Sequence, residues 1–83
     1  LGINAIAEGL EIQPNLPSEL EYAGIEGLSY LGAEFTITVK RDGITVKCNK
    51  NPKNRTFMLS GRRVLGTFER TVSGNYVLLK SAD

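Results

Sequence analysis

The sequence contains no histidine and no tryptophan, and it has only one cysteine, Cys48, and one methionine. Without histidine the chain cannot supply an imidazole general base, a Ser–His–Asp triad or a histidine metal ligand. One cysteine cannot form an internal disulfide or hold a zinc ion by itself. No apolar run approaches the ~20 residues that a membrane-spanning helix needs. We therefore expect no metal site, no cofactor and no membrane partner.

Charge is distributed unevenly between the two halves of the chain, and the first half lacks basic residues. Residues 1–39 carry six acidic side chains and no lysine or arginine, whereas residues 40–83 carry all ten basic side chains and three acidic ones. The net charge of +1 is far from the strongly basic balance of most nucleic-acid-binding domains, so no nucleic-acid partner is expected. We expect the two halves to lie against each other and neutralise their charges. The alternatives are a nucleic-acid-binding β-barrel with a basic face, or a phosphate held by Arg62-Arg63, which we interpret instead as the charged flank of a turn at Ser60-Gly61.

Two neighbouring segments alternate strictly between apolar and polar residues, as half-buried strands do. They are Ala33–Arg41 and Gly43–Asn49. Between them stands Asp42-Gly43, a pair favoured in two-residue hairpin turns. The pattern predicts a β-hairpin with this turn, in which Val39 lies opposite Val46 on an apolar face.

Other short segments resemble strands and are separated by glycine-containing turns. These are Leu10–Gln13, Gly24–Tyr30, Thr56–Leu59, Arg62–Leu65, Gly66–Val72 and Tyr76–Lys80. No segment has the 3.6-residue apolar period of an amphipathic helix. Several short strands at hairpin spacing are typical of sandwiches and barrels. We predict an all-β fold: a small antiparallel β-sandwich of about seven short strands joined by hairpins, forming one domain over residues 1–83.

The remaining route to catalysis is a pair of carboxylates, as in glycoside cleavage. The close pairs are Glu8/Glu11 and Glu19/Glu21, which lie in polar segments with no apolar pocket to raise a pKa. We interpret them as surface charges. Cys48 ends a strand on its apolar face, which predicts a buried thiol rather than a nucleophile. We therefore expect that the chain is not an enzyme by itself.

Aromatic rings can stack on sugars, so the tyrosines and phenylalanines are the candidates for a carbohydrate contact. By alternation, Tyr30, Phe35 and Phe57 belong to the predicted core. Tyr22 follows the prolines in a predicted loop and is the one candidate sugar contact. This leaves a carbohydrate-binding module as an alternative function.

The segment Gly9–Pro17 (GLEIQPNLP) carries a family resemblance. It resembles the G-L-x-I-x-P-x-L-P stretch that opens the C-terminal β-domain of the maltose and kojibiose phosphorylases and their cellobiose phosphorylase relatives. Leu28–Val39 is similar to the next stretch of that family, F-x-x-R-G-x-x-Y-x-I-x-V. Phe35 takes the aromatic position, while Leu31 departs from the usual basic residue. The similar segments cover roughly the first half of the chain.

The resemblance implies an accessory domain in a larger enzyme. In that family a catalytic (α/α)₆ barrel is followed by a short β-sandwich, and the catalytic groups lie in the barrel. We expect this chain, which begins at Leu1 rather than Met, to be the C-terminal part of a longer glycoside hydrolase or phosphorylase. Its expected role is that of a non-catalytic structural module, and its expected partner is the catalytic barrel of the same parent chain. No catalytic residue is carried over.

The same segment has a physical interpretation, because its prolines halt a strand and stiffen an apolar edge. A stiff edge loses little entropy on docking. We therefore predict that the segment packs against another domain; the alternative is an edge strand protected by proline. The residues predicted to make this interdomain packing are Leu10, Ile12, Pro14, Leu16 and Pro17.

Overall fold

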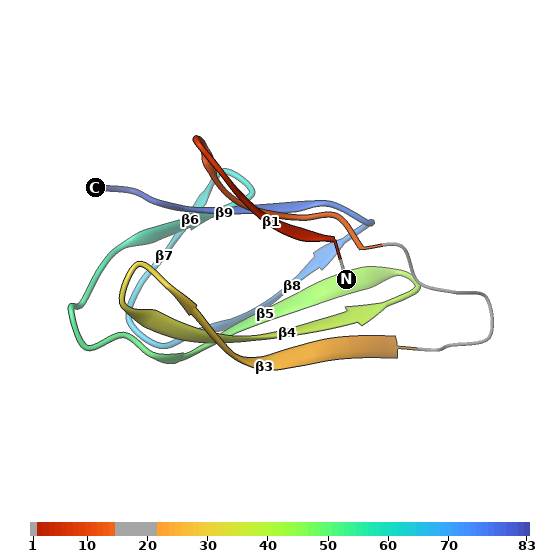
Figure 1. Ribbon diagram of the computed structural model, residues 1–83, viewed down its shortest axis with the longest axis horizontal. Helices are drawn as coiled ribbons and strands as arrows, with labels where there is room; N and C mark the ends of the chain where they lie inside the picture. The colour runs from red at the N-terminus through yellow and green to blue at the C-terminus, as the bar shows by residue number, and fades with distance from the viewer. Residues whose placement is uncertain (1, 15–21) are drawn as a thin grey trace.

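The computed structural model describes residues 2–14 and 22–83, and within these ranges the chain forms nine β-strands and no helix (Figure 1). Consequently, the described residues include no helix long and apolar enough to cross a membrane. The strands are β1 (Ile3–Ile6), β2 (Gly9–Ile12), β3 (Tyr22–Tyr30), β4 (Ala33–Lys40), β5 (Gly43–Lys50), β6 (Phe57–Leu59), β7 (Arg62–Val64), β8 (Glu69–Ser73) and β9 (Val77–Ser81).

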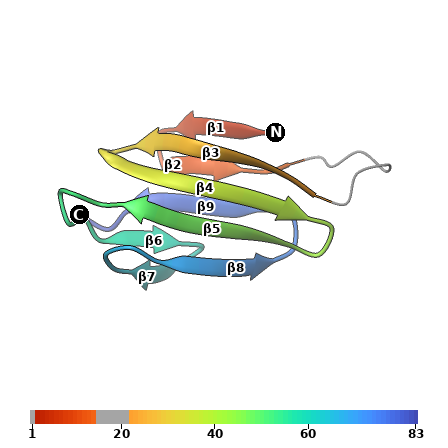
Figure 2. The ribbon, with the colours of Figure 1, turned by 90° about the horizontal axis from the view of Figure 1, so that it is seen from below.

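The strands form two antiparallel sheets that stack face to face (Figure 1). The five-stranded sheet has the order β1-β2-β9-β6-β7, and the four-stranded sheet has the order β3-β4-β5-β8. Seen from below, β7 and β8 lie along the same edge of the sandwich (Figure 2). The predicted all-β antiparallel sandwich is confirmed, although it has nine strands rather than about seven.

The core lies between the sheets, because alternate residues of the inner strands point inward. In β4 the buried positions alternate without a break from Ala33 to Val39. Phe35 lies at the centre, with its ring 5.3 Å from Phe57 in an edge-on contact and 6.2 Å from Phe68. The predicted core positions of Phe35 and Phe57 are confirmed, since both are fully buried. Tyr30 packs against the core from its margin.

The hairpin of β4 and β5 is present, but its predicted register is wrong by two residues. Val39 pairs with Ile44 and Lys40 with Gly43, so Arg41 and Asp42 form the turn. A two-residue shift preserves every side chain's face, which is why the apolar alternation does not distinguish the two registers. Gly43 does not have a positive φ. Instead, a Cβ added there would lie 3.0 Å from the carbonyl oxygen of Val72, so this glycine permits the close approach of β8.

Two other turns do require left-handed backbone. Leu31 and Gly32 have φ of 51° and 80°, and they join Tyr30 directly to its partner Ala33. Ser60 and Gly61 have φ of 46° and 86° and join β6 to β7. These are the positive-φ pairs that the twist of antiparallel hairpins favours, and the predicted turn at Ser60-Gly61 is confirmed.

The segment Ser73-Gly74-Asn75 is not a hairpin turn between strands of one sheet. β8 pairs with β5 in the four-stranded sheet, whereas β9 lies between β2 and β6 in the other sheet. The link therefore crosses from one layer to the other. The backbone N–H of Gly74 donates a hydrogen bond of 3.2 Å to the carbonyl of Asp42, which ties this corner to the β4–β5 turn.

Candidate functional site

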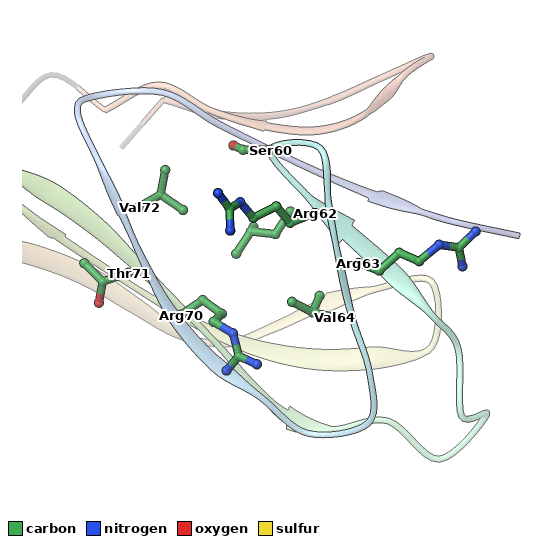
Figure 3. A pocket seen from close by; sticks show the side chains of 8 residues that line it. Ser60, Arg62, Arg63, Val64, Arg70, Thr71 and Val72 are labelled. Atoms are coloured by element: carbon green, nitrogen blue, oxygen red, sulfur yellow. The ribbon is translucent and has the colours of Figure 1, made fainter.

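A cleft of about 500 Å³ opens between β7 and β8, at the edge where the two sheets part (Figure 3). β7 is the last strand of the five-stranded sheet and β8 is the last strand of the four-stranded sheet. Neither edge strand has a further neighbour in the described chain, so the interior side of the sandwich is reached here from solvent. The cleft is lined by Leu59, Ser60, Arg62, Arg63, Val64, Arg70, Thr71 and Val72.

Strand register directs two of the three arginines toward the sandwich interior. Arg62 pairs with Leu59, and Arg70 pairs with Val46 on the other sheet. Leu59 and Val46 are buried in the core, and directly paired residues of antiparallel strands point to the same face. Arg62 and Arg70 therefore approach the cleft from opposite walls.

The third arginine, Arg63, points to the other face of its sheet. It pairs with Met58 on the outer side of the five-stranded sheet, and Figure 3 shows its guanidinium extending away from the cleft. Although Arg62 and Arg63 are adjacent in sequence, their side chains point to opposite faces, and Arg62 shares the cleft with Arg70 of the other sheet instead. The sequence signal for this pairing is weak, because it depends on which strands form the two sheet edges.

The charge that lines the cleft is of one sign, since none of its lining residues is an aspartate or glutamate. Glu69 precedes Arg70, but it pairs with Lys47 on the outer face of the four-stranded sheet. Arg70 donates a hydrogen bond of 3.0 Å to the backbone carbonyl of Glu69 rather than to its carboxylate. Chemically, this arrangement is suited to holding an anion.

The close pairs of carboxylates do not form an acid–base site in the described residues. Glu8 is exposed in the β1–β2 turn, and Glu11 accepts a hydrogen bond of 3.1 Å from the hydroxyl of Tyr76. That hydrogen bond raises the pKa of the Tyr76 phenol. Glu19 and Glu21 lie outside the described residues, and residues 2–14 and 22–83 contain no group of three or more His, Cys, Asp or Glu side chains that could hold a metal ion.

Tyr22 is the first residue of β3, where it pairs with Lys40, so its predicted placement in a loop is wrong. Backbone pairing with β4 extends β3 two residues further toward the N-terminus than the apolar pattern predicts. The side chain of Tyr22 is not among the described parts of the chain. Its contact with carbohydrate stays a prediction.

The segment predicted to dock on another domain is divided by the structure. Leu10 and Ile12 are 4% and 0% exposed, because they pair with Leu79 and Val77 on the inner face of the five-stranded sheet. Their side chains thus pack within the module's own core and offer no surface to a partner. Pro14 is half-buried just after β2. Leu16 and Pro17 lie outside the described residues, and interdomain packing by this segment stays a prediction.

The predicted burial of Cys48 is confirmed, since its side chain is 1% exposed. Its Sγ donates a weak hydrogen bond of 3.4 Å to the carbonyl of Lys50. Burial raises the pKa of the thiol, and an opposing interaction with the backbone of Lys50 offsets this only partly. A buried thiol with a raised pKa has little of the thiolate that reacts with disulfides.

We expect Cys48 to react with an aromatic disulfide reagent at pH 8 roughly a hundredfold or more slowly in the folded protein than in urea, because reaction requires the strand to open. The rate for the folded protein should continue to rise at pH values above the ordinary pKa of a cysteine, since the raised pKa of Cys48 shifts thiolate formation to higher pH. Absorbance of the released thiolate measures both rates. Equal rates in folded and unfolded protein would contradict the burial.

In comparison with known protein families, a family model matches residues 4–65, which is more than half of the chain. The matching family is described as glycosyl hydrolase family 65, C-terminal domain. The matched region runs from β1 to the residue after β7, so it extends beyond the first half that carries the motif resemblance. No curated protein and no solved structure matches the chain. The chain belongs to the family of C-terminal domains of glycosyl hydrolase family 65.

Proposed function

We propose that this domain is a non-catalytic structural module that packs against the catalytic (α/α)₆ barrel of its own parent chain, a glycoside hydrolase or phosphorylase. The observation that carries the proposal is membership in a family defined as the C-terminal domain of glycosyl hydrolases. The lack of histidine and the dispersed carboxylates support a role without catalysis. In this role the domain covers part of the barrel surface and stabilises it.

The outer face of the five-stranded sheet is the best surface for this packing. Strand register places Ile6, Met58 and Leu78 on it, opposite Gly9, Lys80 and Glu11 respectively. Ile6 is 38% exposed, while Met58 and Leu78 are half-buried. Met58 and Leu78 lie on the inner strands β6 and β9, whereas Ile6 lies on the edge strand β1. An apolar centre with a polar rim is the usual composition of an interface.

The outer face of the four-stranded sheet has a different character. It carries a row of hydroxyls, in which Thr38 pairs with Thr45 and Thr45 with Thr71. The hydroxyls of Thr45 and Thr71 lie 2.9 Å apart. The amide of Asn49 donates a hydrogen bond of 2.7 Å to Thr36 on the same face. A face made of hydroxyl and amide groups has little apolar area to gain from docking.

The test introduces Leu78→Glu into the full-length polypeptide that carries this domain. A charge placed in an apolar contact is costly, so the barrel's unfolding temperature should fall by several degrees, consistent with the loss of about 2 kcal/mol in a large protein. Differential scanning calorimetry measures the shift.

The matched control is Thr38→Glu, which places the same charge on the outer face of the other sheet and should leave the barrel transition unchanged. Circular dichroism of the separate 83-residue chain confirms that each variant folds. If both full-length variants unfold at the wild-type temperature, the outer face of the five-stranded sheet does not dock on the barrel. An equal loss from Thr38→Glu would contradict the choice of face.

A further inference from the structure

We propose that the cleft between β7 and β8 binds a small phosphate ester, with its phosphate held by Arg62 and Arg70. The inference is independent of packing against a barrel, because the cleft lies at the edge of the sandwich between the sheets rather than on an outer face. The proposed ligand contacts arginines that take no part in packing of the outer face.

The first argument is electrostatic. One inward-pointing charge on an edge strand is a common protection against pairing with another sheet. Here two edge strands from different sheets each present an inward arginine to one hollow, with no acidic residue in its lining. Like charges that share a cleft repel each other and attract a counter-ion. The arrangement therefore goes beyond edge protection and favours an anion between Arg62 and Arg70.

The second argument concerns which anion fits. The planar guanidinium donates two parallel N–H bonds, a geometry that matches phosphate oxygens. Ser60 adds an exposed hydroxyl at the rim of the cleft (Figure 3). Apolar side chains line the same cleft as the two arginines, so a ligand with a body attached to its phosphate makes more contact there than a bare phosphate ion.

The third argument concerns the size and walls of the cleft. Its volume of about 500 Å³ lies within the range of small-molecule sites. Leu59, Val64 and Val72 supply apolar surface against which the body of an ester can lie. An extended acidic peptide suits the cleft less well, because the edge strands β7 and β8 have only three and five residues. Short edges of this kind are poor templates for an added strand.

The test titrates the 83-residue chain, which has a core of its own, with glucose 6-phosphate at constant ionic strength. We expect saturable binding by calorimetry, with amide shifts of ¹⁵N-labelled protein concentrated in β7 and β8. Arg62→Gln and Arg70→Gln should each weaken binding about tenfold or more, since a hydrogen bond to a charged group contributes roughly 1.5–3 kcal/mol. Both side chains are exposed, so both variants should fold as the wild type does.

Lys80→Gln is the matched control, because it removes the same charge from the outer face of the five-stranded sheet, where Lys80 pairs with Met58, and Lys80 does not line the cleft. It should change the affinity by less than about twofold, because an exposed charge on the outer face makes no contact with a ligand in the cleft and is screened by salt. Equal weakening by all three variants would reduce the effect to general attraction and overturn the site. Absence of glucose 6-phosphate binding at millimolar concentration would also overturn it, as would binding of inorganic phosphate or an acidic peptide at equal or higher affinity. Unphosphorylated glucose should not bind.

Discussion

Replacing Phe35 with alanine is expected to lower the free energy of unfolding by about 3–5 kcal/mol, the range for deleting a buried aromatic ring. Phe35 is 0% exposed and contacts the rings of both Phe57 and Phe68. Each aromatic contact adds roughly 0.5–1.5 kcal/mol beyond the buried area. A domain of this size has about 4–12 kcal/mol of stability in total. The substitution therefore removes a large part of what keeps the two sheets together.

Urea unfolding followed by circular dichroism measures the loss, which should appear as a lower midpoint with an unchanged slope. Tyr76→Ala is the control, because it deletes a ring of similar size that is 41% exposed and hydrogen-bonded to Glu11 at the surface. Its cost should stay within about 1 kcal/mol. Comparable losses from the two substitutions would mean that the core is not centred on Phe35.

The central hairpin shows which structural features the apolar alternation predicts and which it does not. The alternation from Ala33 to Arg41 predicts the buried face of β4 correctly at each of its inward positions. It does not fix the register with β5, because the true pairing of Val39 with Ile44 and the predicted pairing with Val46 put the same faces inward. In the observed register Gly43 is a strand residue that pairs with Lys40 and lies close to Val72, a contact with a strand more than twenty residues away that the hairpin's own pattern does not contain.

The strands that were missed or misassigned lack a local signal. β1 has an almost fully exposed pattern at the edge of its sheet, so apolar alternation cannot reveal it. The link from β8 to β9 has the composition of a hairpin turn, yet it joins strands of different sheets. Glycine and asparagine favour a tight reversal in either case. Which sheet accepts the next strand depends on the unpaired edges already present.

The sequence predicts only part of the candidate cleft. Arg62-Arg63 stood out as a basic pair, but alternation along β7 sends the two side chains to opposite faces. Arg70 joins Arg62 because β8 ends the four-stranded sheet beside β7 at the same edge of the sandwich (Figure 2). That neighbourhood is a property of the complete strand order, and no short motif contains it.

Replacing Gly9 with alanine is expected to destabilise the domain by about 3 kcal/mol, as the sum of backbone strain and overpacking. Gly9 has a φ of 153°, a conformation that side chains rarely adopt. An added Cβ would lie 2.6 Å from the carbonyl oxygen of Leu79 and 2.7 Å from the Cβ of Lys80. Relief of these contacts requires β9 to move away from β2. Thermal and urea unfolding of the variant measure the cost.

Substitutions at two other glycines distinguish the two sources of this cost, backbone strain and steric crowding. Gly74 has a φ of 99° with no heavy atom within 4 Å of an added Cβ, so Gly74→Ala should show backbone strain alone, about 1–2 kcal/mol. Gly43 has the close contact with Val72 but no positive φ, so Gly43→Ala should show the steric part alone. If Gly9→Ala costs no more than Gly74→Ala, the approach of β9 is not a constraint. A larger cost would give a physical reason for the glycine that opens the G-L-x-I motif: it lets β2 lie close enough to β9 for Leu10 and Ile12 to complete the core.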